Sequence, residues 1–286
     1  MKKIAFLLVL SVFITAGCDN DPPKHRQVAV IFTAKSLTNS SSNPTGTGVE
    51  DEIQKILLFG VDDQDKVEKF SVIYNPSSNG VTLTISSNIK SLYAIANPSP
   101  DLEYANPANA LAIIDIINDF SNVPGLPLLM SGMANIYNET VHIELVRAVA
   151  KIKIIGENGF QISSVTVMNT SSKGYVFPKT PFSVPEGKTD YPAIDASDPT
   201  FYLAENTTVS PTKFVVSGQF DGEQTTYIIE QLITNGGATP VNIVRNNCYE
   251  VSITPNTDYD CSITVTILDW VDVPVDGHTI SDENFE

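Results

Sequence analysis

Along most of the chain, apolar and polar side chains alternate in short runs that are separated by turn residues. The clearest run is 81–85 (VTLTI), which has apolar residues on one face and hydroxyls on the other, as expected of a half-buried strand. The same alternation occurs in segments 70–74, 141–145 and 249–253. Turn clusters rich in Asn, Gly, Pro, Ser and Asp lie at 75–80, 221–222 and 235–237. Many short strands with such turns are typical of β-sandwiches and barrels.

One segment has helical rather than strand spacing. Asn106 can cap a helix that has Pro107 in its first turn. The apolar residues that then recur at helical spacing are Ala110, Leu111, Ile113, Ile114, Ile117 and Phe120. The pattern predicts a single helix over 107–120, packed on a sheet with a structural role.

Two features divide the chain into parts. The polar segment 36–48 separates a first strand, 27–35, from the rest of the first domain. Near Val146 a predicted strand ends and another, 148–155, begins at once, which indicates a domain boundary. We therefore expect an all-β protein with two sandwich domains, 18–146 and 147–286, and one short helix in the first.

The first eighteen residues read as an export signal. Two lysines precede an unbroken apolar run, 4–14, that is too short to span a bilayer as a resident helix. Thr15-Ala16-Gly17 then lead into Cys18, which resembles the lipobox of bacterial lipoproteins, although lipoboxes usually have Leu, Val or Ile where Thr15 stands. We expect residues 1–17 to be removed and Cys18 to be diacylated. An ordinary secretory signal is the alternative, and both predict an exported protein.

Charge and cysteine content narrow the partners and the chemistry. The formal charge is −16, and loss of two lysines with the signal would make it about −18, a surface that repels phosphate backbones and excludes nucleic acid as a partner. Beyond Cys18 the cysteines are Cys248 and Cys261. In a hairpin of 249–254 and 262–268 they lie too far apart to bond. We expect two buried thiols that form no disulfide.

Enzymatic signals are poor. The three histidines lie far apart, and no zinc, thiol-redox, nucleophile-elbow or phosphate-loop motif is present. The histidines are His25, His142 and His278, and we expect His142 to face solvent on a strand. Residues 62–65 (DDQD) lack the glycine and distal glutamate of a calcium loop and read as a hairpin turn. Ser131 reads as a turn serine, and Trp270 is the single tryptophan, where sugar-acting domains usually have many. We predict no enzymatic activity, no metal and no cofactor.

The stretch 262–273 (SITVTILDWVDV) reads as a long strand near the C-terminus. Its apolar face comprises Ile263, Val265, Ile267, Val271 and Val273, interrupted by Asp269. Two roles fit this pattern: the last strand of the second domain, or a donor strand that fills a groove in another subunit. In the second role main-chain hydrogen bonds provide affinity and alternate side chains fill pockets.

Six segments in order resemble the fimbrillin family, the type V pilins of Bacteroidales with their minor and anchor subunits. The segments are 50–59, 91–97, 128–132, 145–152, 201–206 and 245–249 followed by Asp269-Trp270. The most recognisable is 145–152, which resembles the Arg-x-x-Ala-Lys-Ile strand of the family; Cys248 is a departure from the family pattern. The resemblance implies two tandem transthyretin-like β-sandwiches and surface export as a lipoprotein, with Asp19 and Asp21 resembling acidic surface-export signals. Arg147 and Lys151 otherwise read as strand residues that support the domain junction.

The resemblance also implies a mode of assembly. In stalk subunits of the family, a trypsin-like protease cuts after a basic residue in the first loop and removes the first strand, and the vacated groove accepts a strand from another subunit. Segment 36–48 has no Lys or Arg, so Lys35 is the nearest candidate for processing. A cut there predicts a polymerising subunit of a fimbria whose partners are other fimbrial subunits. Without a cut, Cys18 keeps its lipid in the outer membrane, and the chain is a fimbrial anchor or an adhesin for a host protein or glycan. Both place it at the cell surface.

Overall fold

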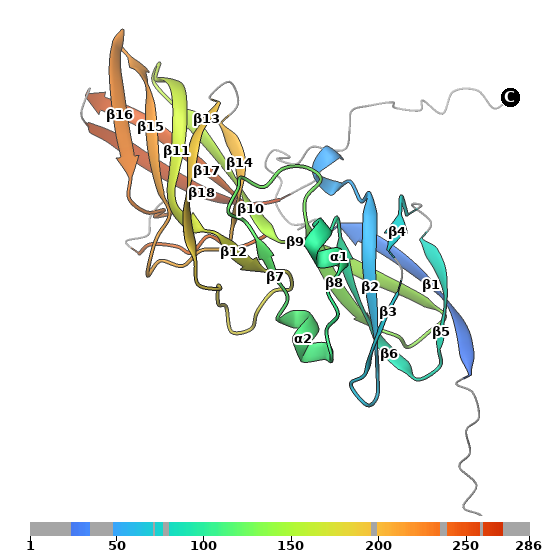
Figure 1. The fold of residues 1–286 in the computed structure, drawn as a ribbon. Coiled ribbons are helices and arrows are strands. Elements are labelled where there is room, and N and C mark those ends of the chain that lie inside the picture. Colours follow the sequence, from blue (N-terminus) through green and yellow to red (C-terminus); the bar gives the residue numbers. More distant parts are fainter. Residues whose placement is uncertain are drawn as a thin grey trace, which may run out of the picture.

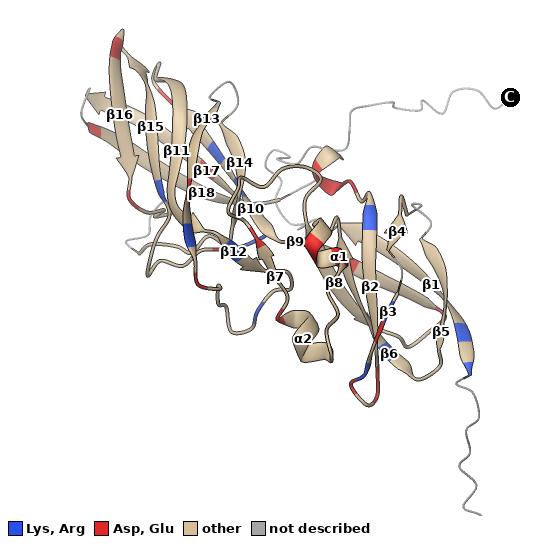
Figure 2. Cartoon of the chain, viewed as in Figure 1, with Lys and Arg blue, Asp and Glu red and all other residues tan. Residues whose placement is uncertain are grey.

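The computed structural model describes residues 24–34, 48–70, 72–76, 80–195, 199–234, 239–257 and 260–270. Two layered bodies of strands lie end to end (Figure 1). The expected all-β class is confirmed, with helix confined to short turns. Within the described ranges, no helix has the length and apolar character needed to cross a membrane. Charged residues are spread over both bodies rather than gathered on one (Figure 2).

The first body is one sheet folded over a core. Its strands are β1 (His25–Ala34), β2 (Lys55–Asp62), β3 (Val67–Lys69), β4 (Ile73–Tyr74), β5 (Val81–Ser86), β6 (Ile89–Ala96), β8 (Met130–Asn135) and β9 (Thr140–Arg147). The strand order is β3-β2-β6-β8-β9-β1-β5, with β4 also on β2. Strands β8 and β9 pair only at Met130 and Ser131, so the sheet turns there and its two halves enclose a shared apolar core.

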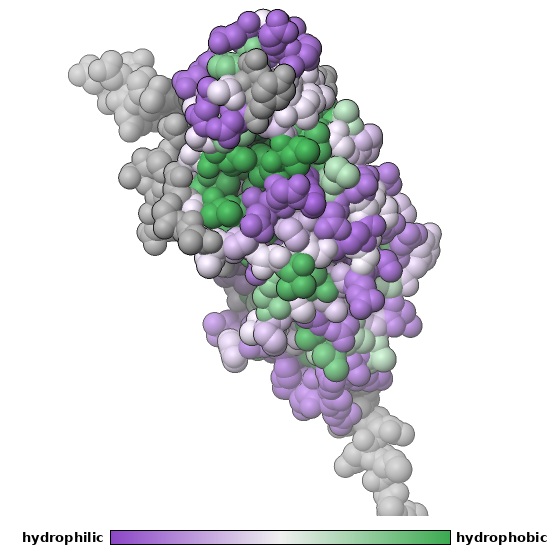
Figure 3. All heavy atoms as spheres, turned by 90° about the vertical axis from the view of Figure 1, so that its left-hand side faces the viewer, coloured by the Kyte–Doolittle hydropathy of each residue, from purple (hydrophilic) through white to green (hydrophobic). Residues whose placement is uncertain are grey.

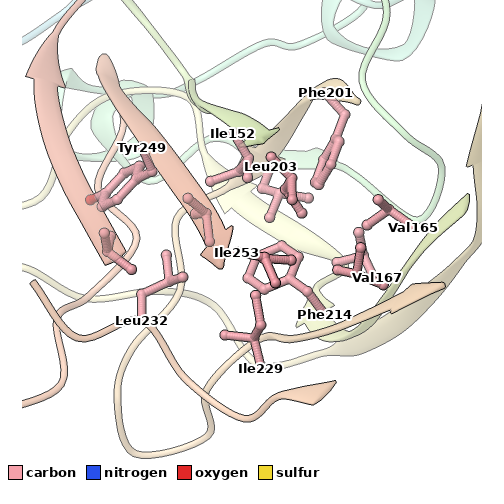
Figure 4. Close-up of a cluster of buried hydrophobic side chains, with 14 of the residues drawn as sticks. Ile152, Val165, Val167, Phe201, Leu203, Phe214, Ile229, Leu232, Tyr249 and Ile253 are labelled. Atoms are coloured by element: carbon pink, nitrogen blue, oxygen red, sulfur yellow. The ribbon is translucent and has the colours of Figure 1, made fainter. Parts of the chain in front are cut away.

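The second body is a sandwich of two four-stranded sheets. Its strands are β10 (Val149–Gly156), β11 (Gln161–Ser171), β13 (Lys188–Asp195), β14 (Thr200–Ala204), β15 (Lys213–Phe220), β16 (Glu223–Ile229), β17 (Asn247–Thr257) and β18 (Asp260–Asp269). The sheet orders are β14-β10-β17-β18 and β13-β11-β15-β16. Figure 4 shows Ile152 and Ile253 of one sheet meeting Val167 and Phe214 of the other across the core. The alternation at 249–253 therefore marks a buried face, as expected.

The single helix expected over 107–120 is wrong. The structure instead has η1 (Gly48–Asp51), α1 (Pro100–Glu103) and α2 (Ala110–Ile114). Asn109 rather than Asn106 caps α2, since its side chain accepts a hydrogen bond from the Ala112 amide at 2.8 Å. Beyond α2 the chain becomes β7 (Ile117–Asp119), which pairs with β12 (Lys173–Tyr175). Helical spacing is a local signal, and this long-range pairing overrides it.

Several local expectations can be compared with the structure. The strands expected at 27–35 and 81–85 are confirmed as β1 and β5. Of the described residues within 70–74, only Ile73–Tyr74 form a strand. Residues 62–65 form the β2–β3 turn, in which the Asp62 side chain accepts from the backbone amides of Gln64 and Lys66 at 2.9 and 2.8 Å. In the described part of the chain, no three side chains of the metal-binding types gather.

The two cysteines form no disulfide, as expected. They lie on β17 and β18 at different levels of the hairpin, with Cys248 opposite Leu268 and Cys261 opposite Pro255. Cys248 is buried, but Cys261 is only partly buried, which corrects the expectation that both are buried. Burial and the nearby Asp260 carboxylate raise the pKa of the Cys261 thiol, so little of it is the reactive thiolate at neutral pH.

Candidate functional site

Strand β1 lies inside its sheet rather than at an edge. It pairs in parallel with β9, from Ala29 opposite Thr140 to Ala34 opposite Leu145. On its other side it pairs antiparallel with β5, from His25 opposite Ser86 to Val30 opposite Val81. Strand β5 pairs with no other described strand. Loss of β1 would therefore open a slot between β9 and β5 with two unpaired backbone edges.

The side chains of β1 complete the core of the first body. Val28 and Val30 are fully buried, and Phe32 and Ala34 pack partly against the same cluster. Burying a valine contributes about 1.5–3 kcal/mol, so β1 is a substantial part of this core. The buried residues that line this slot include Ile85, Val141, Ile143 and Leu145. His142 lies between two of them on β9 and is exposed, as expected.

A pair of glycines offers a test of how tightly β1 is held. Gly80 and Gly222 have nearly equal positive φ angles, +85° and +86°. A Cβ at Gly80 would stand 2.3 Å from the carbonyl oxygen of Val30 in β1, whereas a Cβ at Gly222 meets nothing within 4 Å. We expect Gly222→Ala to lower the free energy of unfolding by about 1–2 kcal/mol through backbone strain alone. We expect Gly80→Ala to lower it further, because β1 must also shift.

Denaturant unfolding of both variants measures this difference. The excess cost of Gly80→Ala should disappear once β1 is removed. Equal costs in the intact chain would contradict the close packing of β1 against residue 80.

A second notable region lies where the two bodies meet. Strand β9 ends at Arg147 and β10 begins at Val149 in a different sheet, so Ala148 alone links them. The β7–β12 ladder ties the same two parts of the chain together. The hydroxyl of Tyr191 donates to the carbonyl of Phe120 at 2.7 Å, and burial raises the pKa of that phenol.

At this junction the Glu50 carboxylate collects three donors. Trp270 Nε1 donates to Oε2 at 3.0 Å, the Tyr202 hydroxyl donates to Oε1 at 2.6 Å, and Lys151 Nζ lies 2.8 Å from Oε1. Glu50 is 2% exposed and Lys151 is 5% exposed, so this ion pair is shielded from water. The ring of Tyr202 stacks on that of Trp270, with centroids 5.8 Å apart and planes 5° apart.

Arg147 extends the same cluster. Its guanidinium forms an ion pair with Asp51 and donates to Asn246 Oδ1 at 3.0 Å. The guanidinium carbon lies 4.6 Å from the centroid of the Trp270 ring, a cation–π contact. Arg147 is fully buried, so these partners must offset the cost of removing its charge from water. We call the set Glu50, Asp51, Arg147, Lys151, Tyr202 and Trp270 the junction cluster.

A neighbouring set of polar contacts corrects the interpretation of Ser131. Ser131 is a fully buried residue of β8, not a turn residue, and its hydroxyl donates to the carbonyl of Val176 at 2.7 Å. Arg245 donates to the same carbonyl at 2.8 Å and pairs with Glu205 at 2.7 Å. The buried serine links the two bodies through this hydrogen bond, and the residues around it in sequence do not predict such a long-range contact.

The candidate donor residues lie partly in β18. Ile263, Val265 and Ile267 stand opposite Ile253, Val251 and Tyr249 of β17, in a ladder that makes β18 an edge strand of its sheet. Val265 is buried, whereas Ile263 and Ile267 are 36% and 39% exposed. Figure 3 shows apolar side chains gathered in the upper half of the molecule, the half that holds the second body. Cys18, Lys35, Val271 and Val273 lie outside the described residues.

Comparisons by sequence find no match: no family model and no curated protein matches this chain. Comparisons with solved structures do find matches. A protein from Bacteroides eggerthii provisionally assigned to cell adhesion superposes with a TM-score of 0.61 at 17% identity, over 87% of this chain and 98% of that one. The tip fimbrial protein Mfa3 from Porphyromonas gingivalis, truncated at its C-terminus, gives 0.59 at 13% identity, over 86% and 100%. A fimbrial assembly protein from Parabacteroides distasonis gives 0.56 at 16% identity, over 86% and 96%.

These matches extend over nearly the whole of each related chain. At such low sequence identities they show a common fold and nothing further. The overall fold is thus shared with proteins described as fimbrial or adhesion proteins. The resemblance to fimbrillins expected from the sequence is confirmed at the level of the fold.

Proposed function

We propose that this chain is a structural subunit of a cell-surface fimbria, exported as a lipoprotein through Cys18 and assembled by donor-strand exchange. The observation that carries the proposal is the place of β1 (His25–Ala34), an interior strand that lies between β9 and β5 and buries Val28 and Val30 in the core. The fold shared with fimbrial proteins supports the same role.

In this proposal a cut after Lys35 frees β1, which is then held only by hydrogen bonds and apolar contacts. Its departure leaves the slot between β9 and β5, which a strand from another subunit fills by backbone pairing. Because the slot and the donor strand are different surfaces, the contact is head-to-tail and extends into a fibre.

The donor role falls best on Val271 and Val273, the part of the candidate stretch beyond Trp270. Ile263, Val265 and Ile267 already form the β17–β18 ladder, and their removal would open the core of the second body at Val251 and Tyr249. A donor that begins after Trp270 leaves this sheet intact.

Two changes in cells test the proposal. Lys35→Ala should leave the chain with its first strand and without SDS-resistant ladders, and deletion of residues 271–286 should abolish ladders in a subunit that stays folded. Lys24→Ala, a charge change just before β1, serves as the control and should polymerise normally. N-terminal sequencing of subunits taken from the ladders should begin at Ser36. Ladders built from subunits that retain His25–Ala34 would overturn the proposal.

A second function, an uncut fimbrial anchor or adhesin, is favoured by one observation. Segment 36–48 contains no Lys or Arg, and Lys35 directly follows Ala34, which is paired with Leu145 in the ladder. A protease would have to reach the end of a formed strand. In this form β1 stays, and the chain remains tethered through Cys18. N-terminal analysis distinguishes the two functions, since the anchor would keep a lipidated Cys18.

A further inference from the structure

We propose that the junction cluster is a clamp that fixes the root of the C-terminal tail, residues 271–286, at one point of the subunit, before and after β1 is removed. The inference rests on the proposed strand exchange and adds a positioning role for Glu50 and Trp270, which reach across 220 residues of sequence. Neither residue need touch the neighbouring subunit to act in this way.

The burial of Trp270 is the first step. It follows β18, an edge strand, and directly precedes residues 271–286, yet it is 0% exposed. Its faces contact the Tyr202 ring and the Arg147 guanidinium, and its N–H donates to Glu50. The indole therefore has partners from three other segments of the chain, which hold Trp270 in one place.

The position of the clamp is the second step. Strand β1 ends at Ala34, opposite Leu145 of β9, and Arg147 of the clamp is two residues further along β9. Two residues of strand span about 7 Å. Trp270, from which the tail starts, thus lies at the same end of the first body as Ala34, the last residue of β1 in the slot.

The third step is that the clamp survives processing. All six residues of the junction cluster follow Lys35 in sequence, so a cut there leaves each of them in the chain. The cations of Arg147 and Lys151 are matched by Asp51 and Glu50. Loss of Asp51, Glu50 or Lys151 would leave a buried charge without its partner, and loss of Arg147 would leave the partly buried Asp51 carboxylate without its cation. A root fixed in advance lowers the entropy cost of docking the tail into a neighbour.

The clamp can be tested in the monomer because Trp270 is the single tryptophan and reports on the cluster by fluorescence. With the mature chain carrying Cys18→Ser, acrylamide should quench Trp270 weakly, and equally before and after the cut at Lys35. Glu50→Gln should raise the quenching constant at least twofold, and Tyr202→Phe, a milder change, should raise it less. Glu250→Gln is the matched control, since its pair with Lys153 is partly exposed at 3.6 Å. Unchanged quenching in Glu50→Gln would overturn the clamp.

Its role in assembly is tested with a pair that can form only a dimer. The donor carries Lys35→Ala and an intact tail, so its slot stays filled; the acceptor is cut after Lys35 and ends at Trp270, so it has no tail. Glu50→Gln in the donor should weaken dimer formation by roughly tenfold, the loss expected when one or two more backbone residues must be ordered on binding. The same change in the acceptor should have less than a twofold effect.

The two arms separate the possible failures. Equal weakening by Glu50→Gln in donor and acceptor would mean general destabilisation and would overturn the positioning role while leaving strand exchange intact. Absence of a dimer between wild-type donor and acceptor would overturn strand exchange itself, and the positioning role with it. The quenching result would then show only that the cluster is rigid.

Discussion

Arg147→Ala is expected to lower the free energy of unfolding by about 3–5 kcal/mol. Arg147 is fully buried, pairs with Asp51, donates to Asn246 and lies over the ring of Trp270. Its removal leaves the Asp51 carboxylate without its cation and opens a cavity beneath the indole. Urea unfolding of the mature chain carrying Cys18→Ser, followed by circular dichroism and by Trp270 fluorescence, measures the loss.

Lys153→Ala provides the matched control for this change. Lys153 lies on β10 and pairs with Glu250 at 3.6 Å, but its side chain is 43% exposed. Exposed pairs contribute about 0–1 kcal/mol, so this variant should unfold almost as the wild type does. A double change, Asp51→Asn with Arg147→Ala, should cost less than the sum of the single changes. If Arg147→Ala were as mild as Lys153→Ala, the junction cluster would not support the contact between the two bodies.

The second large effect is expected from Val30→Asp in β1. Val30 is 0% exposed, and a carboxylate there must either lose its hydration or take up a proton. We expect the uncut chain to lose about 3–5 kcal/mol of stability. After the cut at Lys35 and the loss of β1, the substituted residue is no longer in the subunit. The processed variant should therefore be as stable as the processed wild type. Unfolding midpoints of both forms test this.

Thr33→Asp is the control, because Thr33 is an exposed residue of the same strand. It should lower stability by less than about 1 kcal/mol, because the new carboxylate stays hydrated and meets only Glu144, the residue opposite it on β9. The pair also discriminates between the two proposed functions in cells. An uncut anchor carrying Val30→Asp should be depleted from the surface, whereas subunits already in a fibre should be unaffected. Equal stability of the two uncut variants would contradict the buried position of Val30.

The strands of the first body could be predicted from the sequence where one face is buried and the other is exposed to solvent. Over 81–85 of β5 and 141–145 of β9 the alternation holds, and the buried positions there, such as Val141 and Ile143, are those that the pattern selects. The segment 107–120 could not be predicted in this way. Its apolar residues serve both α2 and β7, and the β7 ladder depends on β12, more than fifty residues further along.

The junction cluster shows a different limit of sequence reasoning. Arg147 and Lys151 stood out as part of a strand motif, and both are strand residues in the structure. Their partners Glu50, Asp51 and Trp270 also lie in segments that resemble fimbrillin motifs, but nothing in one sequence links positions 220 residues apart. A buried Lys or Arg needs a counter-charge, so the search for acidic residues in other motifs is the signal that could have found them.

The one-residue link at Ala148 has a mechanical consequence. A donor strand seated in the slot would pull on β9, and the pull would pass through Ala148 directly into β10. Strand β10 lies parallel to β17, and β17 pairs along its length with β18, at whose end the tail begins. The registers, with Lys151 opposite Cys248 and Cys248 opposite Leu268, place the start of β10 and the end of β18 at the same end of these ladders. Tension along a fibre would therefore enter and leave the second body at this end, and the junction cluster would carry much of the load. A chain with a long hinge between its two bodies would have to straighten before it could carry such a load.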